Sequence, residues 1–226
     1  MGQYFIWYNH AKQEYLDGDG FGEGIKLFAN SNVNAGCINA VLTLMLDEWK
    51  GDKIVCFGDY WTEKPADNTF LQKIKNEIDD HPYDYALDHF EDKAVIFATA
   101  NKKGYAEDVK RAKEFGEEYG YRGPMDLSDL ELFSKETVFV NYVINHTKQE
   151  YYDRSSKRLS DDENEKWFDP TGPLLMAAKG LKPYIFGVWI GDELEVTNDV
   201  TYVTSLGYRD CTNVYSFQHF FEQDEK

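Results

Sequence analysis

One nine-residue pattern occurs twice in this chain and limits the folds that the chain can form. Residues 9–17 read NHAKQEYLD, and residues 145–153 read NHTKQEYYD. A second pair of blocks follows in the same order and at nearly the same spacing, WKGDKI at residues 49–54 and WIGDEL at residues 189–194. Order and spacing preserved together indicate an internal duplication. Two copies are too few for a solenoid, so we expect them to pack about a pseudo-two-fold axis.

Each copy is predicted to begin with a β-hairpin. Residues 4–8 and 138–144 are rich in aromatic and β-branched side chains, which is typical of strands. Residues 4–8 are apolar on both faces, which favours a central buried strand. Polar loops of about four residues follow, and Asn9 and Asn145 suit their start because asparagine side chains bond the local backbone.

A helix and a tight turn are predicted to complete each copy. Residues 35–49 have apolar side chains at helical spacing, and residues 171–179 form a second helix candidate with prolines at its start and Gly180 after it. The Gly-Asp pair of each WxGD block predicts a tight turn, preceded in the second copy by a strand at residues 184–189. The whole pattern is that of an α+β fold, with a mainly antiparallel sheet and packed helices.

The chain is expected to form one compact body over residues 1–226, because no Gly/Ser-rich or Pro-rich spacer divides it. Its predicted parts are copy one at 3–61, a middle insertion at 62–137, copy two at 138–204 and a C-terminal extension at 205–226. In the insertion the pattern predicts helices at 69–78, 106–118 and 126–133, a strand at 93–98, and a loop around His81 and His89 in which Pro82 stops the preceding helix.

The charge balance argues against some partners. The formal net charge is −17 and the pI is about 4.6, so direct binding to nucleic acid or to an anionic membrane is not expected. A basic protein partner fits this charge, and so does a solvated acidic surface with no partner. Three widely spaced cysteines without a CxxC motif, no signal peptide and no membrane-spanning stretch predict a cytoplasmic protein. No motif indicates a cofactor.

The N-terminal region resembles a known set of sequences. The opening MGQYF, the later segment FGxGxKL at residues 21–27 and the block WxGDxIVxxGDY at residues 49–60 are similar to uncharacterised bacterial proteins that begin MGQYY or MGQYF. The resemblance covers the first 60 residues, and the repeated blocks agree with the second half of that family. It implies no activity and supplies no catalytic residues.

Two interpretations of the repeated polar residues are open. His10 and His146 hold equivalent positions and, with Asp17 and Asp153, form either a convergent metal or acid–base site or two separate hairpin tips in water. The DGDGFGE segment that begins at Asp17 lacks the later ligands of a calcium loop, so no metal is predicted there.

The remaining candidates are acidic residues in the same blocks. Glu14 and Glu150 are expected in surface pairs with Lys12 and Lys148. A second set is either turn-forming residues or the paired carboxylates of a hydrolase, and comprises Asp52, Asp59, Asp192 and Asp199.

Two functions from different classes follow. The first is a non-enzymatic acidic protein-binding module, such as an immunity or inhibitor (anti-defence) protein that engages a basic, nucleic-acid-handling partner. It is favoured by the net charge of −17, by 16 tyrosines and 15 phenylalanines, and by the lack of a catalytic motif. The alternative is a hydrolase or small-ligand-binding protein with its site between the two copies. The sequence predicts no oligomeric state.

Overall fold

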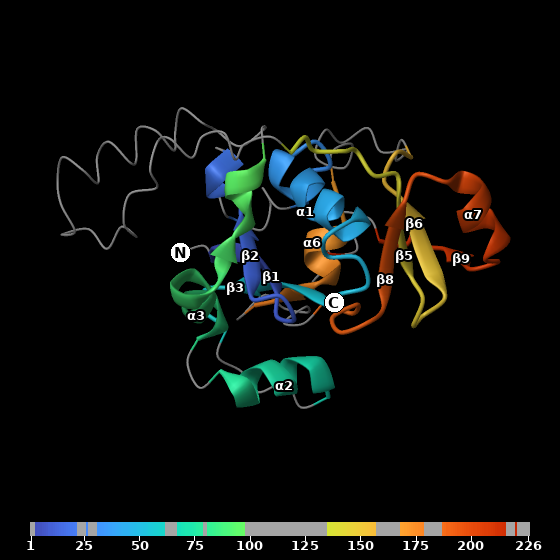
Figure 1. The fold of residues 1–226 in the computed structure, drawn as a ribbon. Coiled ribbons are helices and arrows are strands. Elements are labelled where there is room, and N and C mark those ends of the chain that lie inside the picture. The colour runs from blue at the N-terminus through green and yellow to red at the C-terminus, as the bar shows by residue number, and fades with distance from the viewer. Residues whose placement is uncertain are drawn as a thin grey trace.

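The described part of the chain is an α+β structure built on two β-sheets (Figure 1). The computed structural model describes residues 3–21, 26, 31–61, 67–78, 81–97, 135–156, 168–178, 187–215 and 220. The strand order is β4-β2-β1-β3-β7 in the first sheet and β8-β5-β6-β9 in the second. Helix α1 (Gly36–Leu46) lies between them and contacts β2 on one side and β8 on the other.

The first sheet is centred on the first strand of the chain. Its strands are β1 (Phe5–Asn9), β2 (Glu14–Asp17), β3 (Ile54–Gly58), β4 (Glu91–Asp92) and β7 (Met176–Ala177). β1 pairs antiparallel with β2 and β3, whereas β4 and β7 add parallel edges. All five residues of β1 are buried, as expected for a central strand that is apolar on both faces.

The second sheet contains β5 (Tyr142–Asn145), β6 (Glu150–Asp153), β8 (Leu194–Thr197) and β9 (Arg209–Asp210). β5 pairs antiparallel with β6 and β8, and β9 pairs parallel with β6. The expected strand at residues 138–144 therefore begins only at residue 142. The residues before it bond to side chains instead, since the Val138 amide donates to Thr43 Oγ1 at 2.8 Å.

Corresponding residues of the two hairpins have the same strand register. Asn9 is opposite Glu14 on one side and Ile54 on the other. Asn145 is likewise opposite Glu150 and Leu194. Both hairpins have four-residue loops, so the predicted hairpins are confirmed.

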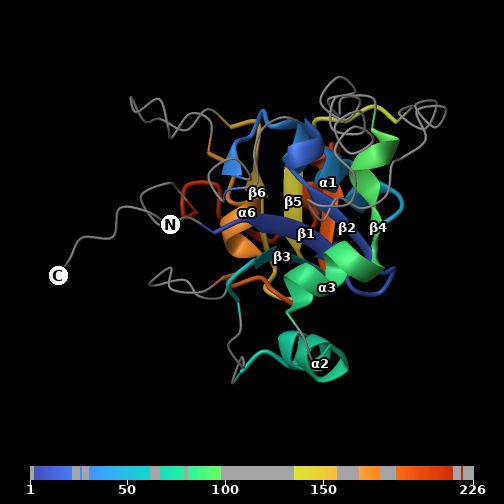
Figure 2. The ribbon, with the colours of Figure 1, turned by 90° about the vertical axis from the view of Figure 1, so that its left-hand side faces the viewer.

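The outer face of the first sheet is covered by two helices. These are α2 (Thr69–Glu77) and α3 (Pro82–His89), and Figure 2 shows α3 lying against the strands of that sheet. Because side chains alternate along a strand, Ile6 and Tyr8 pack with α2 and α3, while Phe5 and Trp7 pack in the larger core that contains α1. Sheet one is thus apolar on both sides.

The second sheet has a shorter helix beside it. This is α7 (Val200–Ser205), which contacts β5 (Figure 1). The other helical elements described are α6 (Thr171–Leu174) and two 3₁₀ turns, η1 (Asp19–Phe21) and η3 (Lys93–Ile96). Within the described segments, no helix combines the length and apolar character needed to cross a membrane.

Two predicted helices are confirmed, and the prediction for residues 171–179 is wrong. α1 and α2 match the expected ranges 35–49 and 69–78 closely. In the second copy, α6 ends at Leu174, and the chain then extends as β7 along β3. The Cys56 amide donates to the Leu175 carbonyl at 2.8 Å, so pairing with a distant strand overrides the local helical pattern.

Three other local predictions need correction. Residues 93–98 were expected as a strand, but Lys93–Ile96 is a 3₁₀ turn because Asp92 Oδ1 accepts from the Ala94 amide at 2.9 Å. Pro82 begins α3 instead of ending a helix, since proline fits the first helical position. Gly187–Trp189 lies in turn and irregular structure, and residues 184–186, 106–118 and 126–133 lie outside the described residues.

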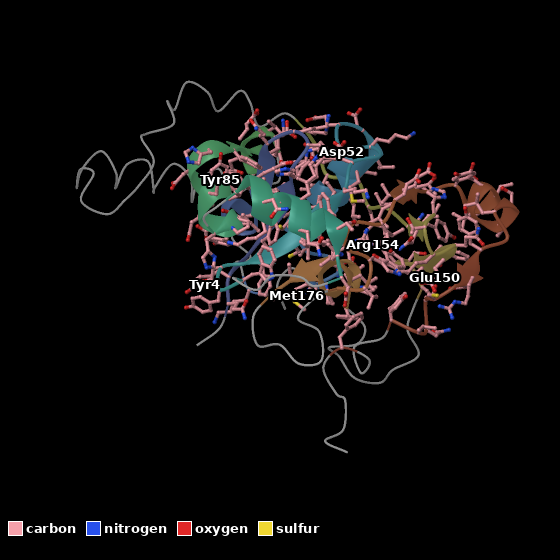
Figure 3. The ribbon with its side chains drawn as sticks, turned by 90° about the horizontal axis from the view of Figure 1, so that it is seen from below. Tyr4, Asp52, Tyr85, Glu150, Arg154 and Met176 are labelled. Carbon is pink, nitrogen blue, oxygen red and sulfur yellow. The ribbon has the colours of Figure 1, made fainter. Side chains whose placement is uncertain are left out.

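A buried ion pair joins distant segments of the chain. Arg154 Nε donates to Asp169 Oδ2 at 2.6 Å, and both side chains are 0% exposed. The other guanidinium nitrogens donate to the Val140 carbonyl at 2.6 Å and to Asn39 Oδ1 at 3.0 Å. In Figure 3, Arg154 is seen between Met176 of the first sheet and Glu150 of the second.

Replacing Arg154 by Met should lower the free energy of unfolding by about 3–5 kcal/mol, because Asp169 would remain as an unpaired buried charge. Lys12→Met is the control, since Lys12 forms a partly exposed pair with Asp52 and should cost less than about 1 kcal/mol. Urea denaturation measures both variants. Equal losses for the two would contradict the central role given to Arg154.

Candidate functional site

The two hairpin loops are held by the asparagine that begins each of them. Asn9 Oδ1 accepts from the Lys12 amide at 3.2 Å, and Asn145 Oδ1 accepts from the Lys148 amide at 2.9 Å. The last loop residue has a left-handed conformation in each case, with φ of 57° at Gln13 and 56° at Gln149. The asparagines therefore have the loop-forming role that the sequence predicted.

The same asparagines bind the aspartates of the WxGD blocks. Asn9 Nδ2 donates to Asp52 Oδ2 at 2.9 Å, and Asn145 Nδ2 donates to Asp192 Oδ2 at 2.7 Å. In both copies the loop lysine lies 3.7 Å from the same carboxylate oxygen. These contacts fasten each aspartate to its own hairpin through side chains, a role that the sequence pattern did not predict.

Each WxGD block forms the tight turn that was predicted. The Asp52 amide donates to the Trp49 carbonyl at 3.0 Å, and the Asp192 amide donates to the Trp189 carbonyl at 3.1 Å. The intervening glycine has a φ of 80° at Gly51 and 83° at Gly191, in the left-handed region that favours glycine.

Alanine at the two turn glycines should have unequal effects. Gly51→Ala should cost about 1–2 kcal/mol of stability from backbone strain alone, because a Cβ there would meet no atom within 4 Å. Gly191→Ala should cost clearly more, because its Cβ would lie 2.9 Å from Phe70 Cβ. Thermal and urea unfolding of both variants test this order, and equal losses would argue against close packing of the second turn on α2.

Glu14 and Glu150 are not the surface partners of Lys12 and Lys148, so that prediction is wrong. Their side chains are only 14% and 10% exposed, because both point from β2 and β6 toward the interior. Trp49 Nε1 donates to Glu14 Oε2 at 2.5 Å, and Lys93 Nζ lies 3.5 Å from Glu14 Oε1. Cross-strand geometry thus gives these carboxylates partners far away in sequence.

The corresponding cluster in the second sheet has different partners. Tyr215 donates to Glu150 Oε2 at 2.8 Å, Trp189 Nε1 donates to the Tyr215 hydroxyl at 3.3 Å, and Arg209 pairs with Glu150. Burial alone would raise the pKa of Glu150, but the hydrogen bonds from Tyr215 and Arg209 outweigh burial and lower it. The ionised form of Glu150 therefore stabilises the fold.

A lowered carboxyl pKa predicts a stability loss in acid. The Glu150 contribution should be present above the ordinary carboxyl pKa of about 4.3 and should disappear as the pH falls through the folded-state pKa. Glu150→Gln should therefore flatten the acid side of the stability profile, because the variant has no carboxyl group at this position to be protonated. Urea denaturation between about pH 7 and pH 3 measures the slope. An unchanged slope in Glu150→Gln would contradict the assignment.

The repeated histidines lie in separate loops with different partners, and the part of the second interpretation that leaves them in water is wrong. His10 Nε2 lies 2.5 Å from Glu77 Oε2 of α2, and its Nδ1 lies 3.1 Å from the Tyr8 hydroxyl. His146 Nε2 lies 2.8 Å from Glu195 Oε2 of β8, and its Nδ1 lies 3.2 Å from the Tyr208 hydroxyl. Each histidine thus links its hairpin to a neighbouring element.

The hairpin geometry separates each histidine from the aspartate of its block. Asp17 is opposite Ile6 and Asp153 is opposite Tyr142, three positions from the loop end, which corresponds to roughly 10 Å at 3.3 Å per residue. These aspartates accept from the amides of Asp19 and Ser155 at 2.9 and 2.8 Å. Within the described ranges, no group of three His, Cys, Asp or Glu residues is placed to hold a metal ion.

Asp59 and Asp199 share a sequence offset but have different roles. Asp59 Oδ1 accepts from the Tyr4 amide at 3.1 Å, whereas Asp199 Oδ1 caps α7 by accepting from the Thr201 and Tyr202 amides at 2.8 and 3.0 Å. Burial raises the pKa of Asp59, and the Asp84 charge adds to this effect. In the part of the chain that the structure describes, the two aspartates have separate partners and form no common site.

The two sheets differ most on their outer faces. In the first sheet the outward residues Ile6, Tyr8, Tyr15, Val55 and Phe57 are buried with α2 and α3. The register places Tyr142, Ile144, Tyr151, Glu195 and Thr197 at the corresponding positions of the second sheet. Three apolar positions of the first sheet are thus occupied by Tyr142, Glu195 and Thr197 in the second. Of the five residues in the second sheet, Ile144 alone is fully buried.

Two tyrosines and two aspartates form the part of this surface that water reaches: Asp210 is exposed, and the other three are half-buried. We call Tyr142, Tyr151, Asp153 and Asp210 the open face. The tyrosine rings meet edge-on with centroids 6.4 Å apart. Asp153 is directly opposite Tyr142, and Asp210 is directly opposite Tyr151. Burial, with the charges of Asp153 and Asp210, raises the pKa of Tyr142, and burial together with Asp210 raises that of Tyr151.

The aspartates of the open face are oriented by the backbone. Asp153 Oδ1 accepts from the Ser155 amide at 2.8 Å, and Asp210 Oδ1 accepts from the Thr212 amide at 2.8 Å. In the part of the chain that the structure describes, neither carboxylate forms an ion pair with a lysine, arginine or histidine. Neither copy of the repeat, taken alone, predicts this face. The signal was available in the repeat itself, where Ile6, Val55 and Phe57 correspond to Tyr142, Glu195 and Thr197.

Comparison with known proteins adds no family to this arrangement. No family model matches the chain, and neither a curated protein nor a solved structure matches it.

Proposed function

We propose that this protein is a non-enzymatic binding module that engages a basic protein, as an immunity or inhibitor (anti-defence) protein would. The observation that carries this proposal is the open face, where tyrosines stand beside carboxylates that have no cationic partner in the described part of the chain. Tyrosine is enriched in protein interfaces because it offers a large apolar ring with a polar end. A partner that handles nucleic acid would bring the complementary positive charge.

The role of the repeated polar residues supports binding over catalysis. Asn9 and Asp52 hold a loop to a turn, His10 links a hairpin to a helix, and Glu14 is paired in the interior. Asn145 and Asp192 repeat the first contact in the other copy. Residues with structural partners of this kind need no catalytic role to explain their repetition.

We further propose that the chain, as one body over residues 1–226, arose by duplication and has pseudo-two-fold symmetry. Two exchanged elements support this idea. α1 lies between β2 and β3 in sequence but packs against β8, and β7 lies between β6 and β8 in sequence but pairs with β3. The matched registers of the hairpins support it as well.

The net charge also predicts how a complex would form. A charge of −17 attracts a basic partner over long range and speeds their encounter, and this effect weakens as salt screens it. All three cysteines are free and buried, which agrees with the proposal that the protein works in the cytoplasm. The complex should therefore be tighter at low ionic strength.

Affinity capture with the full-length chain tests this function. We expect lysate of the source organism to yield a protein of high pI that is retained at about 50 mM salt and largely released at about 500 mM, because the Debye length shortens several-fold over this range. An unrelated protein of equal net charge is the control for non-specific retention. If every retained protein also binds the control, or if none is basic, the proposed function is wrong.

A further inference from the structure

We infer that the open face is the docking site for a cationic segment of the partner polypeptide, whose arginine or lysine side chains lie over Tyr142 and Tyr151 and bind Asp153 and Asp210. This inference rests on the proposed function, because it names the surface and the chemistry of that same interaction. Two cationic side chains of this segment are spaced so that one reaches Tyr142 and Asp153 while the other reaches Tyr151 and Asp210.

The two tyrosine–aspartate pairs form two adjacent binding positions for a cation. Each tyrosine has a carboxylate as its direct cross-strand neighbour, Asp153 beside Tyr142 and Asp210 beside Tyr151. Direct neighbours have Cβ atoms about 5 Å apart, which lets one guanidinium group contact a ring face and a carboxylate together. β5, β6 and β9 are adjacent strands, so the two places lie side by side across the sheet.

The two carboxylate side chains are already oriented by hydrogen bonds to the backbone. Each uses Oδ1 to accept a backbone amide at 2.8 Å, which fixes the direction of its side chain before any partner arrives. Asp153 is half-buried and Asp210 is exposed, so a cation would reach them without a large desolvation cost. Arginine suits the site better than lysine because its planar group both stacks on rings and forms paired hydrogen bonds to carboxylates.

The first sheet has aspartates at the corresponding positions but no accessible aromatic ring beside them. Asp17 and Asp92 occupy the positions that correspond to Asp153 and Asp210, opposite Ile6 and Tyr15. They also accept backbone amides, from Asp19 and Ala94 at 2.9 Å in both cases. Their neighbours Ile6 and Tyr15 are buried with α2 and α3, so no ring is available to a cation.

Two double variants with the same charge change test the site. The probe is a labelled ten-residue peptide of alternating arginine and serine, and its binding to the full-length protein is followed by fluorescence anisotropy at about 150 mM salt. Asp153→Asn with Asp210→Asn should weaken binding at least about fivefold, because two direct contacts are lost. Asp17→Asn with Asp92→Asn should change it less than about twofold, since only the long-range charge differs. Circular dichroism checks that both variants keep the fold.

A third variant separates ring contacts from charge. Tyr142→Leu with Tyr151→Leu keeps apolar bulk and net charge but removes both rings. It should weaken the arginine peptide more than a lysine peptide of the same pattern, and it should not change the weak binding of free spermine. Equal losses for both peptides, or no loss, would overturn the stacking that we infer.

The outcomes also distinguish failure of the proposed docking site from failure of the proposed function. Equal weakening by the two aspartate pairs means that the peptide binds by general charge, which overturns the open face as the docking site. If the basic protein captured from lysate still binds the Asp153→Asn/Asp210→Asn protein normally, the site is likewise wrong while the proposed function stands. If capture yields no basic partner, the function itself fails, whatever the two aspartate pairs do to peptide binding.

Discussion

The buried contact between Arg154 and Asp169 is the interaction on which the arrangement of this fold depends. Arg154 follows β6, yet its guanidinium group also bonds to Asn39 in α1 and to the Val140 carbonyl just before β5. A fully buried charge is stable only when its hydrogen-bonding groups have partners, so these segments must meet in one geometry. Asp169 in turn binds the amide of Thr171, which places α6 and the following strand β7 at the edge of the first sheet.

The many carboxylates of this acidic chain have two different environments. Glu14 and Glu150 point inward from β2 and β6, where Lys93 and Arg209 balance them and tryptophan and tyrosine side chains contribute hydrogen bonds. Asp153 points outward from the same strand β6, and Asp210 points outward from β9. The alternation of side chains along a strand is the reason that one strand carries both kinds. The inward residues stabilise the fold, and the outward residues are open to a partner.

Covering helices account for the contrast between the two sheets. α2 and α3 together bury the outer face of the first sheet, and its outward residues are accordingly apolar. Beside the second sheet lies α7, which has six residues. Most of the face it adjoins is polar, as expected of strands in contact with water. The same hairpin pattern therefore supports an interior layer in one half and an exposed surface in the other.

The local features of this protein could be predicted from its residues. The hairpins, the Gly51 and Gly191 turns and the helix α1 were predictable because they depend on neighbouring residues, on left-handed glycine and on 3.6-residue periodicity. Only the tertiary structure shows that residues 176–177 pair with β3, that Trp49 donates a hydrogen bond to Glu14, and that Tyr151 is opposite Asp210 of β9. These contacts join residues far apart in the chain, and their partners are chosen by sheet pairing and burial, which no local pattern specifies.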